Sequence, residues 1–148
     1  MADEGEDKQR IPVGHGSIPV SYTHLAEREG LLFVGGFAHP PNADAVLWFA
    51  REIFPLIRRE LPDVKFYVAG SRVTDEIKAL EEPGNGIIIK GFVSEEELAQ
   101  LYGHCKVVVV PLRYGAGVKG KVVEAIYNGA PIVTTVSYTH LDVYKRQE

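Results

Sequence analysis

Glycines and lysines with a chemically suggestive spacing occupy one stretch of the chain, residues 111–135 (PLRYGAGVKGKVVEAIYNGAPIVTT). The pattern predicts a strand end, a glycine-rich loop, a helix, a helix stop and another strand. Lys119 and Lys121 lie at or near the predicted helix start, where the helix dipole disfavours cations by about 0.3–1 kcal/mol each. A bound anion would relieve this conflict, and helix N-termini are ready-made phosphate sites. Three glycines would let the backbone approach such a ligand: Gly115, Gly117 and Gly120.

Glu124 adds an acid to this pattern, one helical turn after Gly120 and Lys121 on the same face. The glycine loop, the two lysines and the single acid together predict a sugar-nucleotide site. The diphosphate would lie on the loop, and the ribose hydroxyls would bind the carboxylate. The alternatives are plainer: Glu124 as a solvated acid in the first turn, and the lysines as an exposed charged face.

Length and composition narrow the class of protein. A chain of 148 residues with 45% hydrophobic residues fits one soluble domain with a sizeable core. The net charge of -4 argues against nucleic-acid partners. The only cysteine, Cys105, fits a reducing compartment and an inert buried thiol. No apolar run approaches the ~20 residues that span a bilayer, and no secretory signal is apparent, so we expect a cytoplasmic protein.

Two kinds of catalytic site have no counterpart in the sequence. No cluster of His, Cys and Asp has the spacing of metal ligands, so we expect no metal. No serine lies in a nucleophile elbow with His and Asp partners. The sequence therefore assigns no catalytic residue.

The hexapeptide VSYTHL occurs twice, at 20–25 and at 136–141. The second copy continues to residue 147 and resembles a translated sequencing adaptor, because it back-translates into near-palindromic DNA; a genuine surface tail is the alternative. We therefore expect three parts in the chain. They are a doubtful leader at 1–25, either chimeric or disordered, a nucleotide-sugar-binding domain at 26–135, and an artefactual tail at 136–148. Both true ends of the domain are expected to be missing.

Between these flanks, strand and helix patterns alternate. Helical spacing predicts helices at 41–61, 74–81, 94–103 and 118–128. We expect Asn42 to cap the first helix and Pro55 to kink or divide it. Ser94 and Glu97 form a capping box at the start of the third. Five short apolar runs predict strands: 31–36, 64–71, 86–91, 106–111 and 131–135.

This alternation predicts a doubly wound α/β domain, with a parallel sheet covered on both faces. Ligands of such sheets bind at the carboxyl ends of the strands. Four predicted strands end in glycine-containing segments: Gly35-Gly36, Gly70-Ser71, Gly91-Phe92 and 113–117. We therefore expect these segments to share one rim of the sheet.

From about Gly30 to Thr135 the chain resembles the C-terminal, donor-binding domain of the retaining glycosyltransferases of family four, often called group 1. The resemblance rests on LLFVGG, KFYVAGS, IIIKGFVSEEELAQLY, VVVVPLRYGAGVKGKVVEA and NGAPIVTT. It implies the GT-B fold, in which two Rossmann-like domains enclose the active site. This chain would be one Rossmann-like half.

The resemblance also implies roles for individual residues. Gly35 and Gly36 would approach the donor diphosphate, and Gly91 and Phe92 would lie near the nucleotide base. Glu124 matches the second acid of the family's E-x7-E motif, which holds the ribose hydroxyls. The remaining donor-binding candidates come from the loop after the fourth strand and the helix that follows: Arg113, Gly115, Ala116, Gly117, Lys119 and Lys121.

Two positions depart from the family pattern. The first acid of E-x7-E, which contacts the donor sugar in relatives, is replaced by Ala116. The loop after the first strand, where many relatives carry a basic residue, offers only His39. Phosphate binding would then depend on Lys119 and Lys121, with Arg113 as a weaker candidate.

The resemblance implies a transferase that moves a sugar from a nucleoside diphosphate donor to an acceptor hydroxyl, with retention and without a metal or other cofactor. The acceptor, a glycan, lipid or small molecule, would bind through a missing N-terminal domain. We therefore expect this chain to be inactive alone. The alternative is a non-catalytic nucleotide-binding or regulatory α/β module.

Overall fold

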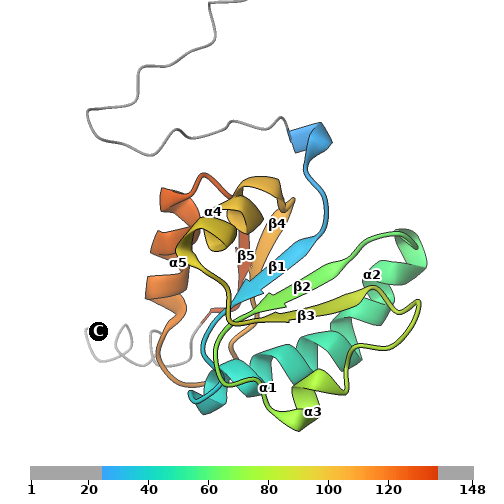
Figure 1. Ribbon diagram of the computed structural model, residues 1–148, viewed down its shortest axis with the longest axis horizontal. Coiled ribbons are helices and arrows are strands. Elements are labelled where there is room, and N and C mark those ends of the chain that lie inside the picture. The colour runs from blue at the N-terminus through green and yellow to red at the C-terminus, as the bar shows by residue number, and fades with distance from the viewer. Residues whose placement is uncertain (1–24, 137–148) are drawn as a thin grey trace, which may run out of the picture.

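Parallel strands form the centre of the molecule in the computed structural model, which describes residues 25–136 (Figure 1). Across this part of the chain the sheet has five strands in the order β3-β2-β1-β4-β5. All neighbouring pairs are parallel, which confirms the predicted doubly wound α/β class. In chain order the strands are β1 (Leu31–Val34), β2 (Phe66–Ala69), β3 (Ile87–Gly91), β4 (Val107–Val110) and β5 (Ile132–Thr134).

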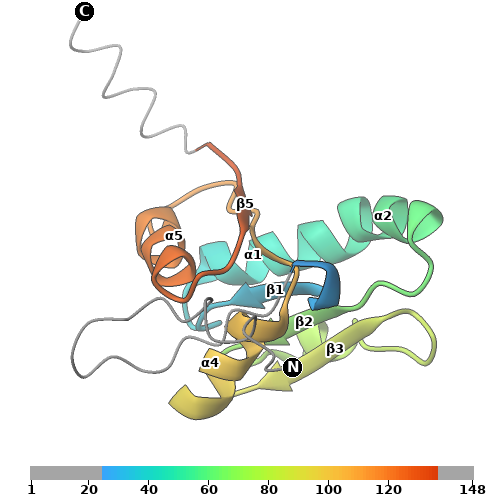
Figure 2. The ribbon, with the colours of Figure 1, turned by 90° about the horizontal axis from the view of Figure 1, so that it is seen from above.

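Helices cover both faces of this sheet (Figures 1 and 2). One face carries α1 (Pro40–Trp48), α2 (Phe54–Glu60) and α3 (Asp75–Lys78), and the other carries α4 (Glu95–His104) and α5 (Val118–Tyr127). A short 3₁₀ turn (Leu25–Glu27) precedes β1. Each helix joins two parallel strands, which is the arrangement that buries both faces of a parallel sheet.

The first predicted helix is divided, as Pro55 indicated. A π-helical segment (Phe49–Ile53) separates α1 from α2, and Pro55 lies in the first turn of α2. Proline has no N–H to donate to the preceding turn, so the backbone changes its hydrogen-bond register there. The expectation that Asn42 caps this helix is wrong. The helix begins at Pro40 with His39 as its N-cap, and Asn42 is buried inside the first turn.

The other helix ends follow the local sequence signals closely. Ser94 Oγ accepts a hydrogen bond from the Glu97 amide at 3.1 Å, which confirms the predicted cap of α4. Thr74 caps α3 in the same way, through the amide of Ile77. Gly129, with φ 68°, ends α5, since this left-handed conformation favours glycine.

The core lies on both sides of the central strands. Leu32, Phe33 and Val68 are fully buried, and so is Phe66. On the side of α1 and α2, the ring of Phe66 packs against Phe49 and Phe54 with centroids 4.8 and 5.6 Å apart. Burying large aromatic rings of this kind is worth roughly 1.5–3 kcal/mol each, so these contacts hold the divided helix against the sheet.

The predicted leader at 1–25 and tail at 136–148 lie outside the described residues, apart from Leu25 and Val136. The domain limits 26–135 stay a prediction. Within residues 25–136, no helix combines the length and the apolar character that a membrane span requires.

Candidate functional site

The carboxyl ends of β1 and β4 meet where the strand order reverses. The chain runs outward from β1 through β2 to β3, and then returns to place β4 on the other side of β1. The following helices, α1 and α5, leave on opposite faces of the sheet (Figure 2). Ligands of open α/β sheets bind in the crevice at this point. We call this region the switch-point rim: Gly35-Gly36, residues 113–117 and the first turn of α5.

Two contacts hold the loops after β1 and β4 against each other. His39 Nε2 lies 3.0 Å from the backbone oxygen of Ala116. A Cβ at Gly115 would lie only 2.5 Å from Pro41 Cγ, so glycine is what allows the loop to approach the start of α1. The structure therefore brings together two of the glycine segments that the sequence placed on one rim.

The start of α5 presents unpaired backbone amides at this rim. Its N-cap, Gly117, has φ 122°, a conformation that side chains rarely adopt. Among residues 25–136 no side chain caps the helix, and its first turn contains no acid. The first amides of α5 therefore lack intrahelical acceptors and carry the positive end of the helix dipole. Lys119 and Gly120, in the same turn, are exposed. This is the geometry of an anion site.

The two predicted phosphate lysines point in different directions. The Lys119 side chain is exposed, and no hydrogen bond or ion pair of Lys119 occurs within residues 25–136. The Lys121 ammonium instead donates to the backbone oxygen of Val34 at 2.7 Å, at the end of β1. Burial lowers the pKa of Lys121, and Glu124 opposes part of this shift. Of the two lysines, Lys119 is therefore the one whose side chain faces solvent at the rim.

Glu124 lies on α5 with its side chain exposed, one turn after Lys121. It also approaches α4, where Tyr102 is almost completely buried. Burial and then the nearby Glu124 carboxylate raise the pKa of Tyr102 above its ordinary value. Sequence reasoning missed Tyr102 as a neighbour of Glu124, because no local spacing relates α4 to α5.

The Arg113 side chain contacts residues of α1. Its guanidinium donates two hydrogen bonds to the Asp44 carboxylate, at 2.9 and 2.5 Å, and lies 5.1 Å from the Trp48 ring centroid. The Arg113 hydrogen bond lowers the pKa of Asp44. Arg113, which we predicted as a weaker phosphate ligand, therefore binds a face of α1 instead. The sequence did contain a signal for this contact, because Asp44 and Trp48 are four positions apart and so share one helix face.

Gly91 and Phe92 lie at the same carboxyl edge of the sheet but two strands from β1. Gly91 has φ 68°, and its backbone oxygen accepts a hydrogen bond from the Gly70 amide at 2.8 Å. With strands about 4.8 Å apart, this corner lies roughly 10 Å from the end of β1. The Phe92 ring is 81% exposed, which leaves the corner open.

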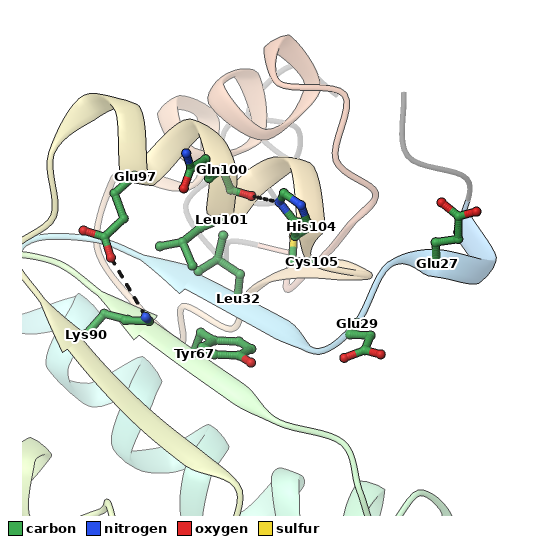
Figure 3. A pocket seen from close by; sticks show the side chains of 10 residues that line it. All are labelled: Glu27, Glu29, Leu32, Tyr67, Lys90, Glu97, Gln100, Leu101, His104 and Cys105. Atoms are coloured by element: carbon green, nitrogen blue, oxygen red, sulfur yellow. Dashed lines mark hydrogen bonds and ion pairs between the residues drawn. The ribbon is translucent and has the colours of Figure 1, made fainter. Parts of the chain in front are cut away.

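A pocket of about 400 Å³ lies elsewhere, between α4 and the face of the sheet (Figure 3). Its walls include Glu27, Glu29, Tyr67, Leu101 and Cys105. We call it the α4 pocket. Two pairs of its polar groups are in contact: Lys90 Nζ lies 3.9 Å from a Glu97 carboxylate oxygen, and His104 Nδ1 lies 2.7 Å from the backbone oxygen of Gln100. None of the predicted donor-binding residues lines it.

The fold and the rim define a class: a Rossmann-like α/β domain with an uncapped helix start at its switch point. Comparison with known proteins gives the family. Residues 28–145 match the sequence profile described as "Glycosyl transferases group 1". The chain belongs to this family, which confirms the predicted group 1 membership.

A curated relative from Klebsiella pneumoniae, described as an uncharacterized 44.6 kDa protein in the cps region, is 33% identical over 132 residues. The match covers 84% of this chain but 33% of the relative, so the chain spans about a third of that protein's length.

Proposed function

We propose that this chain is the donor-binding half of a GT-B glycosyltransferase, with a nucleoside diphosphate sugar on the switch-point rim. The observation behind the proposal is the uncapped start of α5. Its first amides lack intrahelical acceptors, and Lys119 in the same turn is exposed. The loop that leads into α5 contacts the loop after β1 through His39, in a chain of a glycosyltransferase family. A diphosphate is the anion that such a donor would place there.

Each part of the donor has a proposed partner. The diphosphate binds the amides at the start of α5 and Lys119. The ribose hydroxyls donate to the exposed Glu124 carboxylate. The base lies toward Gly91 and Phe92, at the open corner of the rim. The sugar lies near Ala116, whose backbone amide replaces the acid found there in relatives.

The rim contributes to the reaction through electrostatics. Transfer breaks the bond between the anomeric carbon and the diphosphate oxygen, and the acceptor oxygen forms the new glycosidic bond while its proton passes to a base. Negative charge grows on the leaving diphosphate, and fixed amides and a cation stabilise it. We propose that the anomeric configuration is retained. The acceptor and the base belong to a second domain of the full-length enzyme, which we place in the cytoplasm.

Titration calorimetry with UDP, GDP and ADP tests donor binding. We expect one of them to bind the chain, and Glu124→Ala to weaken that binding by roughly tenfold through loss of a charged hydrogen bond. Glu96→Ala, in the first turn of α4, is the matched control and should change nothing. A folded chain that binds none of the three would contradict the proposal and favour a regulatory α/β module.

A turnover assay tests the role of the second domain. Without acceptor contacts, we expect no sugar transfer from UDP-, GDP- or ADP-sugars by this chain alone. Robust transfer by the isolated chain would show that the acceptor site lies within it.

A further inference from the structure

Lys121 reaches from α5 to the underside of the Gly35-Gly36 turn. Its ammonium donates to the Val34 backbone oxygen at 2.7 Å and lies 5.1 Å from the centroid of the Phe33 ring. The ammonium thus satisfies a carbonyl at the carboxyl end of β1, and the aromatic ring adds a cation–π contact.

Asn42 approaches the same turn from α1. Its side chain is only 4% exposed, and its Nδ2 donates to the Gly36 backbone oxygen at 2.7 Å. Among the described residues its Oδ1 has no hydrogen-bond partner. An unpartnered buried oxygen costs free energy, and the hydrogen bond from the same amide to Gly36 offsets part of that cost.

Gly35 is what allows both side chains to fit. A Cβ at Gly35 would lie 2.9 Å from Asn42 Nδ2 and would overlap the Lys121 ammonium. Gly35 has no left-handed φ, so space rather than backbone conformation requires glycine here. The two side chains therefore meet under one residue and hold the carbonyl groups on either side of it.

These two hydrogen bonds matter for an anion. Carbonyl oxygens carry partial negative charge, and those of Val34 and Gly36 flank the turn that faces the proposed diphosphate. Donors from Lys121 and Asn42 hold both oxygens inward and offset their charge. The Gly35 amide donates to the Ala69 backbone oxygen at 3.0 Å and the Phe37 amide to the Ser71 backbone oxygen at 2.9 Å. The amide that this turn offers to a phosphate is therefore that of Gly36, and no carbonyl oxygen opposes it there.

We propose that Lys121 and Asn42, from helices on opposite faces of the sheet, are positioning residues that together brace the Gly35-Gly36 turn, while Lys119 contacts the donor. The ligand in this inference rests on the function proposed above. The brace itself is a property of the unliganded chain. Lys119 and Lys121 look equivalent in the sequence, but in this proposal Lys119 binds the ligand and Lys121 positions the turn.

The test compares Lys121→Met with Lys119→Met, its matched control on the same helix turn. In amide NMR spectra of the ligand-free chain, Lys121→Met should shift the Gly35 and Gly36 resonances, and Lys119→Met should leave them unchanged. Both variants should weaken binding of the accepted nucleoside diphosphate by about tenfold. Only Lys119→Met should also reduce the salt dependence of binding, since it removes a direct charge contact.

Gly35→Ala tests the brace without any ligand. The added methyl group should expel the ammonium, and the pKa of Lys121, measured by NMR titration, should rise toward its ordinary value. An unchanged Lys121 pKa in this folded variant would overturn the brace. A second result would also overturn the brace. In it, the Lys121 Nζ resonance moves on ligand binding, and Lys121→Met leaves the Gly35 and Gly36 resonances unaffected. Failure of UDP, GDP and ADP to bind would refute the donor site and leave this titration to decide the brace.

Discussion

The switch-point rim and the α4 pocket are opposite in character. The pocket is hollow, but three glutamates line it, and it includes His104 at the negative end of the α4 dipole. The rim joins an uncapped helix start, an exposed lysine and two glycine turns. An anion would be repelled by the first and attracted by the second. For a phosphate ligand, the direction of backbone groups is more informative than the size of a cavity.

Charge reversal should separate the two regions most strongly. Lys119→Glu places a negative charge at the start of α5, and we expect roughly 10- to 100-fold weaker nucleoside diphosphate binding by calorimetry. Lys90→Glu, in the α4 pocket, should leave the affinity unchanged. An equal loss from both variants would mean that binding follows net charge and that the rim is not the site.

A substitution that strains the backbone of the rim should cause a smaller loss of nucleoside diphosphate affinity. Gly117→Ala adds a side chain at φ 122°, a strain of roughly 1–3 kcal/mol that distorts the start of α5. We expect a lower melting temperature and about tenfold weaker binding. Gly84→Ala is the control, because Gly84 has φ 79° in a distant open turn. It should lower the melting temperature and spare binding; a loss of affinity there would show a general effect of stability.

The Arg113–Asp44 pair should have a modest effect on stability. Because the folded pKa of Asp44 is lowered, its stabilising contribution is present above the ordinary aspartate pKa and is lost as pH falls through the folded value. We expect Asp44→Asn to lower the melting temperature by a few degrees at pH 7, and the difference to shrink below about pH 4. If the difference in melting temperature does not depend on pH, the stabilisation comes from packing of Arg113 on Trp48 and not from the ion pair.

The smallest effect concerns the α4 pocket. Burial raises the pKa of Cys105 to about 11, and only 3% of the residue is exposed. At pH 8 roughly 0.1% of the thiol is ionised, so iodoacetamide should label the native chain very slowly and the urea-unfolded chain rapidly. Fast labelling of the native chain, followed by mass spectrometry, would show that the pocket opens in solution.

Sequence reasoning was most successful where local chemistry decides structure. Ser94 caps α4 through its own side chain, as predicted, and Pro55 divides a helix because it lacks an N–H. It failed at Asn42. There His39 is the N-cap, and the asparagine binds Gly36 in a turn that only the folded sheet places beside it.

By itself the sequence determined the alternation of strands and helices, the glycine-ended strands and the family. The first two follow from periodicity and backbone conformation, which neighbouring residues set, and the family follows from the resemblance of several motifs in order. Only the tertiary structure decided the directions of the charged groups. Lys121 turns inward because Gly35 leaves space beneath β1, and Arg113 turns to α1 because Asp44 and Trp48 lie opposite it. Long side chains reach several acceptors, and packing between distant segments selects among them.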